Sequence, residues 1–323
     1  MTAGDTTLTT HRTEHRVTVS APARRVFDLV ADITGWPHTF PPTVHAEYAE
    51  RGASEERIRI WATANGEVKA WTSHRSLDRE GLRVRFRQEK SQHPVAGMGG
   101  EWIIRPVDGE RSEVILTHDF QAVEDDPAHV DWIHRAVDRN SGAELAALKP
   151  RRNARTARNG TLFTFADEVT VTGAPGDVYD YLNEARRWQE RLPHVAAVSL
   201  DEPAPGVQRL GMDTKGPDGT VHTTESVRIC FPQDRIVYKQ FTMPPLMAVH
   251  TGTWRIAPAA DGHGTTVTSL HTVVVDDSAV TTVLGPDATL ADARRFLRDA
   301  LGRNSRTTLG FAKEYAEERA RRA

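Results

Sequence analysis

The sequence has one cysteine, Cys230, among its 323 residues. A lone cysteine excludes an internal disulfide framework and any metal site built from several cysteines, and it is typical of a reducing compartment. No stretch approaches the ~18 consecutive apolar residues of a membrane-spanning helix. The first residues also lack the basic and then apolar layout of a signal peptide. We therefore expect a cytoplasmic protein with no membrane partner.

The sequence lacks a strong excess of charge of either sign. Its 41 Lys and Arg stand against 44 Asp and Glu, a net charge of −3, which gives no electrostatic case for a nucleic-acid partner. Glycine-rich phosphate loops, His-Glu-x-x-His and Gly-x-Ser-x-Gly are absent, and the 14 histidines show no metal-ligand spacing. We expect no metal and no cofactor, which leaves chemistry that side chains and water perform in a shaped cavity.

What the sequence does contain is a duplication. Residues 17–43 match residues 169–195 at a shift of 152, with seven identical pairs. The same shift, with a gap of one residue at some positions and a further insertion in the second copy near residues 281–292, continues along most of both halves. It relates the following pairs: Arg75 and Arg228, Phe86 and Tyr238, Gln88 and Gln240, Trp102 and Trp254, His118 and His271. Two copies of about 150 residues are each long enough to bury a core.

The duplication predicts an N-terminal domain over 1–150, a linker over 151–160, and a C-terminal domain over 161–323. Residues 149–160 contain five basic residues, no acidic ones and no aromatic ones. Nucleic-acid binding sites interleave aromatic residues with basic ones. The composition therefore favours a solvated linker over a nucleic-acid patch.

Each copy has the same predicted order of elements, which indicates an α+β fold. A first strand over 14–20 is followed by short helices, several alternating strands and a long amphipathic helix, over 130–148 in the first copy and 290–315 in the second. The later strands of the first copy are expected over 57–64, 67–75, 82–88, 100–106 and 114–123. This order is typical of a curved antiparallel sheet wrapped around one helix, with a space between them for side chains or a ligand.

A predicted hairpin assigns side chains to that space. Asn65-Gly66 is a strong signal for a two-residue turn, which pairs residues whose numbers sum to 131. The more apolar face then carries Ile58, Ile60, Trp71, Ser73 and Arg75. An arginine there either reaches the rim, pairs with Glu56, or serves a function.

Two further strands add polar groups to the same face. Alternation turns His118 inward with Leu116 and Phe120, while Asp119 points outward. An inward histidine is either a satisfied core residue or a group for proton transfer near neutral pH. Phe86 and Gln88 share a second inward stripe, where the amide either binds a ligand carbonyl or satisfies the backbone.

Several large apolar side chains are expected around the same space. Trp36, Trp71 and Trp102 stand at or near inward positions. Tryptophan is an ordinary core residue, but several around one space suit a flat, partly unsaturated ligand.

With these motifs the sequence resembles the di-domain aromatase/cyclases of bacterial type II polyketide synthases, which belong to the START/Bet v 1-like helix-grip superfamily. The resemblance covers nearly the whole chain. It rests on these segments: Asp32-Ile-Thr-Gly-Trp-Pro37, Trp71-Thr-Ser-His-Arg75, Phe86-Arg-Gln-Glu89, Met98-Gly-Gly-Glu-Trp102, Leu116-Thr-His-Asp-Phe120, Trp188-Gln-Glu-Arg-Leu-Pro-His-Val195 and Ile236-Val-Tyr-Lys-Gln240.

The resemblance implies first-ring aldol cyclisation, dehydration and aromatisation of a poly-β-ketone held on an acyl carrier protein. Its implied partners are that carrier protein and the other synthase subunits, with no cofactor. The expected catalytic residues are Arg75 and Gln88, which hold the oxyanion, and His118, which relays protons. The expected substrate-binding residues are Trp36, Ile58, Ile60, Trp71, Ser73, Phe86, Met98 and Trp102. The expected second-domain pocket contains Arg228, Tyr238, Gln240, Trp254 and His271.

The residues alone also allow two functions other than catalysis. In the first, the protein is a passive module that binds or transfers a hydrophobic small molecule. In the second, it is a chaperone-like subunit that holds the nascent polyketide for another enzyme. The sequence also leaves open which domain is catalytic and whether the substrate has been reduced beforehand.

Overall fold

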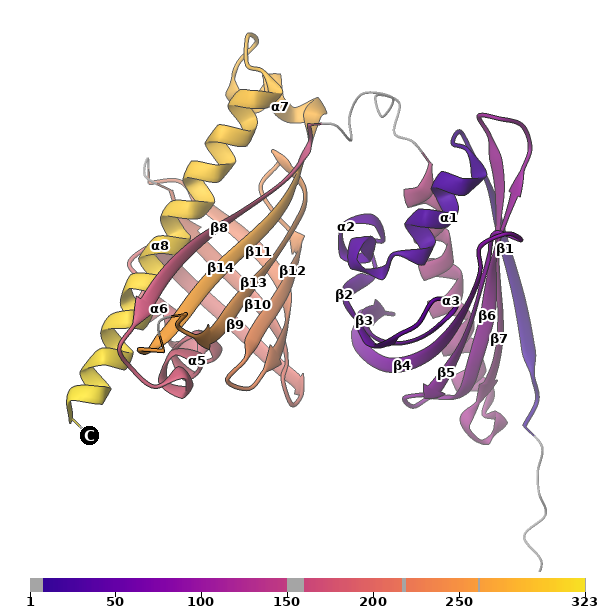
Figure 1. Cartoon of the computed structure of the whole chain (residues 1–323), viewed down its shortest axis with the longest axis horizontal. Helices are drawn as coiled ribbons and strands as arrows, with labels where there is room; N and C mark the ends of the chain where they lie inside the picture. Colours follow the sequence, from indigo (N-terminus) through magenta and orange to yellow (C-terminus); the bar gives the residue numbers. More distant parts are fainter. Residues whose placement is uncertain (1–7, 150–159, 217–218, 261, 323) are drawn as a thin grey trace, which may run out of the picture. The chain divides into compact units, whose positions relative to one another are not determined.

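The computed structural model describes residues 8–149, 160–216, 219–260 and 262–322. The chain divides into two compact units, Met1–Ala154 and Arg155–Ala323, here called domain 1 and domain 2. Apart from Gly160, the predicted linker lies outside the described residues. In each domain a seven-stranded antiparallel sheet curves about one long helix (Figure 1). This confirms the predicted α+β helix-grip architecture.

Domain 1 follows the strand order β1-β7-β6-β5-β4-β3-β2. Its long helix is α3, and its short helices lie before β2 and, in the case of η2, between β7 and α3. The strands are β1 (His11–Val19), β2 (Thr43–Arg51), β3 (Glu55–Ala64), β4 (Glu67–Asp78), β5 (Arg83–Lys90), β6 (Val95–Pro106) and β7 (Ser112–Ala122). The helices are α1 (Ala23–Ala31), η1 (Ile33–Gly35), α2 (Trp36–Thr39), η2 (Val123–Asp125) and α3 (Pro127–Leu148).

Domain 2 repeats this order as β8-β14-β13-β12-β11-β10-β9. It adds a short helix, α7, before its long helix α8, where the second copy carries its insertion. The strands are β8 (Leu162–Val171), β9 (Val195–Ala204), β10 (Val207–Lys215), β11 (Val221–Phe231), β12 (Arg235–Thr242), β13 (Met247–Pro258) and β14 (Thr265–Val275). The helices are α5 (Pro175–Asn183), η3 (Ala185–Arg187), α6 (Trp188–Arg191), η4 (Asp277–Ala279), α7 (Val280–Leu284) and α8 (Leu290–Arg322).

The hairpin between β3 and β4 has the predicted register. Asn65 and Gly66 adopt φ values of 48° and 82°, and positive φ at both positions is what a type I′ turn requires. Ile60 therefore pairs with Trp71, and Glu56 pairs with Arg75. The prediction that Arg75 faces inward is confirmed, since its exposed fraction is 1%.

Two features of the sheet escaped the sequence analysis. Strand β2 was not predicted because bulges at two places in its pairing with β3 interrupt the alternation that marks a strand. Strand β6 begins at Val95 rather than Gly100, because its glycines weaken the strand pattern. Gly100 is needed there, since a Cβ at this position would come within 2.7 Å of the Phe86 ring.

The strand pairing also aligns the two copies. Arg228 pairs with Gln208 as Arg75 pairs with Glu56. Thr224 therefore stands where domain 1 has Trp71, an assignment the sequence left between Thr223 and Thr224. Among the described residues, no helix is long and apolar enough to span a membrane.

Candidate functional site

The guanidinium of Arg75 is held by groups of the protein itself. It donates hydrogen bonds to the backbone carbonyls of Val30, at 3.0 Å, and Ala31, at 3.3 Å, at the end of α1. The Glu56 carboxylate lies 3.4 Å away, and the Trp36 ring lies beneath the guanidinium with its centroid at 5.1 Å. Arg75 thus joins strand β4 to the end of α1 and to the tryptophan that follows it.

Burial shapes the ionisation of this pair. It lowers the pKa of Arg75 to about 10, against the opposing effect of Glu56, so the guanidinium stays charged at neutral pH. Burial also raises the pKa of Glu56, again against the effect of its partner. The side chains of both residues are nearly inaccessible, so each charge depends on the other for compensation.

Domain 2 has the same arrangement without the carboxylate. Arg228 donates to the Leu182 carbonyl at 2.6 Å, and its guanidinium lies 5.0 Å from the Trp188 ring centroid. Buried Gln208 takes the place of Glu56. The recurrence of the contacts to the helix end and the tryptophan shows that both arginines brace the same corner of the fold.

His118 faces the interior of domain 1 from β7. Its Nδ1 atom is buried and has no hydrogen-bond partner among the described residues. The Phe86 ring packs edge-on at a centroid distance of 5.4 Å, and burial lowers the pKa of His118 to about 4. As predicted, Asp119 faces the other way, where it pairs with Arg87. The interior imidazole is therefore neutral at pH 7, with one ring nitrogen free.

Gln88 lies on β5, beside the strand that carries Met98. Its Nε2 donates to the Met98 sulfur at 3.7 Å, and its Oε1 accepts from Ser91 Oγ at 2.7 Å. Both Gln88 and Met98 remain partly accessible although they face the helix. Phe86 and His118, on the same face of the sheet, are also partly accessible.

Most of the other predicted substrate-binding residues have little surface that a substrate could contact. Trp102 is 4% exposed and stacks on Phe40 at 5.8 Å. Three more are buried in the sheet: Ile58, Ile60 and Ser73. Trp36 and Trp71 are partly accessible and pack in one apolar cluster with Ile58 and Ile60. Of the predicted apolar lining, Trp36, Trp71, Phe86 and Met98 keep accessible surface.

The sequence analysis missed Glu144, on the interior side of α3. It stands three residues after Ser141 and four before Leu148, both of which are buried. Burial alone raises its pKa to about 8. A carboxyl group on an otherwise apolar helical face was a signal that the periodicity of this helix could have supplied.

Domain 2 contains a denser polar cluster around His271. Its Nδ1 lies 3.0 Å from His250 Nε2 and 3.1 Å from the Tyr238 hydroxyl. Its Nε2 lies 2.8 Å from Ser305 Oγ and 3.1 Å from Ser269 Oγ. His250 Nδ1 in turn lies 2.8 Å from Gln240 Oε1. The predicted residues Tyr238, Gln240 and His271 therefore meet, while Trp254 is buried in the core.

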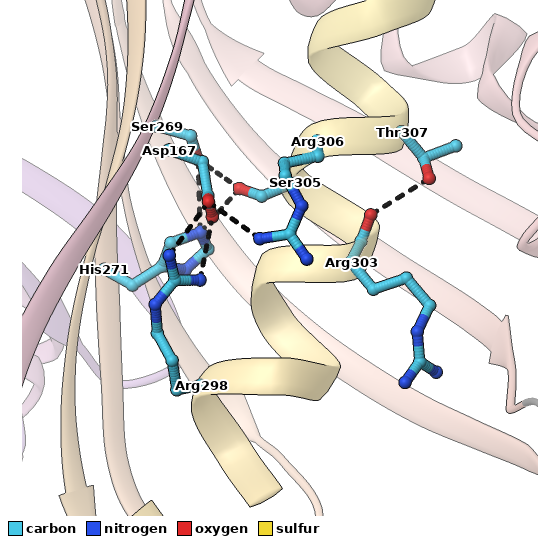
Figure 2. Close-up of polar contacts among 8 residues, drawn as sticks. All are labelled: Asp167, Ser269, His271, Arg298, Arg303, Ser305, Arg306 and Thr307. Carbon is cyan, nitrogen blue, oxygen red and sulfur yellow. Dashed lines mark hydrogen bonds and ion pairs between the residues drawn. The ribbon is translucent and has the colours of Figure 1, made fainter. Parts of the chain in front are cut away.

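An ion-pair cluster fixes α8 beside this network. Figure 2 shows Asp167 of β8 between the guanidinium groups of Arg298 and Arg306, at 3.0 and 2.9 Å. Gly302 lies beneath them, and a Cβ there would come within 2.1 Å of Arg298 Nη1. The cluster holds the turn of α8 that brings Ser305 to His271.

The sequence analysis also missed His250. A signal was present, because the shift of 152 places it where domain 1 has Met98. His250 is 2% exposed, and burial together with His271 holds its pKa well below the ordinary range. The two domains thus hold different chemistry at equivalent positions.

Comparison with known proteins extends this picture. The family model described as polyketide cyclase / dehydrase and lipid transport matches twice, over residues 10–151 and 163–317. The granaticin polyketide synthase bifunctional cyclase/dehydratase of Streptomyces violaceoruber is 46% identical, over 96% of this chain and 95% of that protein. The actinorhodin polyketide synthase bifunctional cyclase/dehydratase of Streptomyces coelicolor is also 46% identical, over 94% and 96%.

Solved structures match nearly the whole chain. The di-domain ARO/CYC BexL from the BE-7585A biosynthetic pathway has a TM-score of 0.83 and 52% identity, covering 95% of this chain and 99% of that one. StfQ, the di-domain ARO/CYC from the steffimycin pathway, has a TM-score of 0.79 and 36% identity at the same coverage. The chain therefore belongs to the polyketide cyclase and dehydrase family, as a di-domain aromatase/cyclase.

Proposed function

We propose that this enzyme closes the first ring of a poly-β-ketone held on an acyl carrier protein, and then removes water to make that ring aromatic. The proposal extends to this chain the cyclase/dehydratase activity for which its relatives are named. The observation that carries it is the neutral interior histidine of domain 1, His118, whose Nδ1 atom has no hydrogen-bond partner among the described residues and whose ring packs against Phe86.

His118 and Gln88 supply the groups that an aldol closure needs. The carbon between two ketones loses a proton, attacks a second carbonyl carbon, and leaves negative charge on that oxygen. In the proposal His118 Nδ1 accepts the proton and returns it to the new alkoxide, so that protons balance. The Gln88 Nε2 group, whose printed acceptor is the weak Met98 sulfur, donates instead to the carbonyl oxygen, while Ser91 holds Oε1.

The apolar lining supplies orientation. A poly-β-ketone is flexible, and bringing one carbon against one carbonyl removes much of the entropic part of the barrier. Trp36, Trp71, Phe86 and Met98 present apolar surface that favours one folded arrangement of the chain and excludes water.

The direct role predicted for Arg75 stays a prediction. Its hydrogen bonds go to backbone carbonyls, and its ion pair to Glu56. In the proposed mechanism it acts as a positioning residue, because it fixes Trp36 at the edge of the interior.

His118→Gln tests the proposal. The glutamine keeps a polar side chain but cannot relay a proton, so cyclised product should form roughly 10²–10⁴-fold more slowly. The measurement is product formation with the purified ketosynthase, the carrier protein and the full chain. Thermal unfolding of the variant checks that it folds.

The matched control is His74→Gln, which changes a histidine on the outer face of β4, exposed beside Glu55. We expect this variant to work at the wild-type rate. Unchanged cyclisation in His118→Gln would contradict the proposal. It would favour a passive module that binds the substrate without reacting with it.

A further inference from the structure

In domain 2, the hydrogen-bond partners of His250 and His271 show which ring nitrogen of each histidine carries its proton. Gln240 contacts His250 and decides the first of these protons. Its Oε1 is a carbonyl oxygen and only accepts, so the proton on the 2.8 Å contact belongs to His250 Nδ1. A neutral His250 then has a bare Nε2. The 3.0 Å contact between that atom and His271 Nδ1 therefore takes its proton from His271. Both imidazoles are thus protonated at Nδ1, an assignment made from their hydrogen-bond partners.

Two serines complete this hydrogen-bond network. With its proton on Nδ1, His271 accepts at Nε2 from a serine hydroxyl, and both Ser305 and Ser269 lie within 3.1 Å. These hydroxyls also bond to each other at 2.7 Å. Each hydrogen bond of this network is then donated in the same direction, from Ser305 on α8 through the two histidines to Gln240 on β12.

This arrangement leaves one hydroxyl proton unused. Tyr238 Oη lies 3.1 Å from the same His271 Nδ1, whose single proton is directed to His250 Nε2, so this nitrogen has no lone pair to accept the phenolic proton. Among the described residues no acceptor is recorded for the phenolic proton itself. The ring lies over Gly252, where a Cβ would come within 2.3 Å, and it keeps partly accessible surface although it faces the interior. The free proton is therefore available to a molecule in that space.

We propose that Tyr238 is a catalytic proton donor in domain 2, which protonates the hydroxyl group that leaves a cyclised intermediate as water. His271 and His250 are positioning residues that hold the phenol with its proton free. This inference rests on the proposed function and assigns the dehydration step to domain 2.

The proposed step balances. The carbon–oxygen bond breaks with its electron pair on the hydroxyl, which takes the phenolic proton and leaves as water. The adjacent carbon, acidified by a ketone, releases its proton to water in the interior, and its electron pair forms the new double bond. Solvent then returns a proton to the phenolate, so nothing is oxidised or reduced.

Domain 1 provides the natural comparison. In each domain one row of the sheet runs from β5 or β12 through a glycine to the interior histidine: Phe86, Gly100 and His118, or Tyr238, Gly252 and His271. At the two positions that matter, domain 1 has Phe86 for Tyr238 and Met98 for His250. It therefore lacks both the phenolic proton and the histidine that orders it.

The test replaces the domain 2 residues by those of domain 1, as Tyr238→Phe and His250→Met in the full chain. In reconstitution with the ketosynthase and carrier protein, we expect Tyr238→Phe to keep cyclisation. Dehydration should slow by roughly 10²–10⁴-fold, so that a cyclised species one water heavier accumulates in the mass spectrum. His250→Met should slow the same step by a smaller factor. Tyr315→Phe, which removes a hydroxyl elsewhere in domain 2, should behave as wild type.

The possible outcomes test the role of Tyr238 separately from the proposed function. Normal dehydration by Tyr238→Phe, with cyclisation intact, overturns the role of Tyr238 and leaves the proposed function standing. Failure of the wild-type chain to alter the products at all overturns both.

A second measurement does not depend on activity. Long-range ¹H–¹⁵N correlation spectra of the histidine-labelled full chain should show His250 and His271 protonated at Nδ1. Protonation at Nε2 in both rings would reverse the direction of these hydrogen bonds and overturn the proposal. In His250→Met we expect the tautomer of His271 to change, a result that a purely structural role for His250 would not produce.

Discussion

Replacing Arg75 by alanine should destabilise domain 1 by about 3–5 kcal/mol, because it leaves the Glu56 carboxylate buried without its compensating charge. The same change removes the donors to the Val30 and Ala31 carbonyls at the end of α1. A loss of this size is a large part of the stability of an ordinary domain. Hydrogen exchange of peptides from β4 in the full chain measures it for domain 1 alone.

Two variants isolate the buried charge from the rest of the effect. Arg75→Ala combined with Glu56→Gln should recover part of the lost stability, because no carboxylate then stays buried unpaired. Arg228→Ala in domain 2 is the matched control, since Gln208 already stands in place of the carboxylate. We expect a smaller loss there, measured on peptides from β11.

These measurements also test the catalytic role that the family resemblance implies for Arg75. If Arg75→Ala keeps the wild-type stability of domain 1 and yet loses cyclised product, the guanidinium acts on the substrate. If stability and product fall together and the Glu56→Gln change restores both, the guanidinium acts through the corner of the fold that it braces.

Glu144 should make domain 1 less stable as the pH rises. Burial raises its pKa in the folded domain to about 8, above the ordinary value of 4.5. The neutral form is thus favoured on folding, and its stabilising effect is complete below about pH 4.5. That effect is lost as the pH rises through about 8. The slope is at most about 1.4 kcal/mol per pH unit, so the total is on the order of a few kcal/mol.

Glu144→Gln should remove this dependence, because the amide does not ionise. We expect the variant to match the wild type near pH 4.5 and to exceed its stability at pH 9, in denaturant unfolding of the full chain followed by hydrogen exchange in α3. The difference between the two proteins isolates Glu144 from His118, whose lowered pKa makes its own contribution to stability rise with pH.

Glu80→Gln serves as the control for this experiment, since Glu80 is exposed in the turn before β5. Its profile should follow the wild type at every pH. A Glu144→Gln profile parallel to that of the wild type would show that the Glu144 carboxyl is well solvated in the folded domain.

The sequence by itself determined the features that depend on neighbouring residues. The duplication, the order of elements and the inward direction of Arg75 and His118 follow from repetition, a period of two along strands and one turn at Asn65-Gly66. Backbone geometry sets each of these locally. Strand β2 escaped because bulges break that local period.

Only the tertiary structure decided what the inward groups touch. Arg75 meets carbonyls of α1 that lie 44 and 45 residues earlier in the chain. His271 joins His250 of β13 to Ser305 of α8. Alternation gives the face of a side chain but not the partner that packing brings to it. For this reason the histidine network of domain 2 and the satisfied guanidinium of Arg75 emerged only when sheet and helix were placed together.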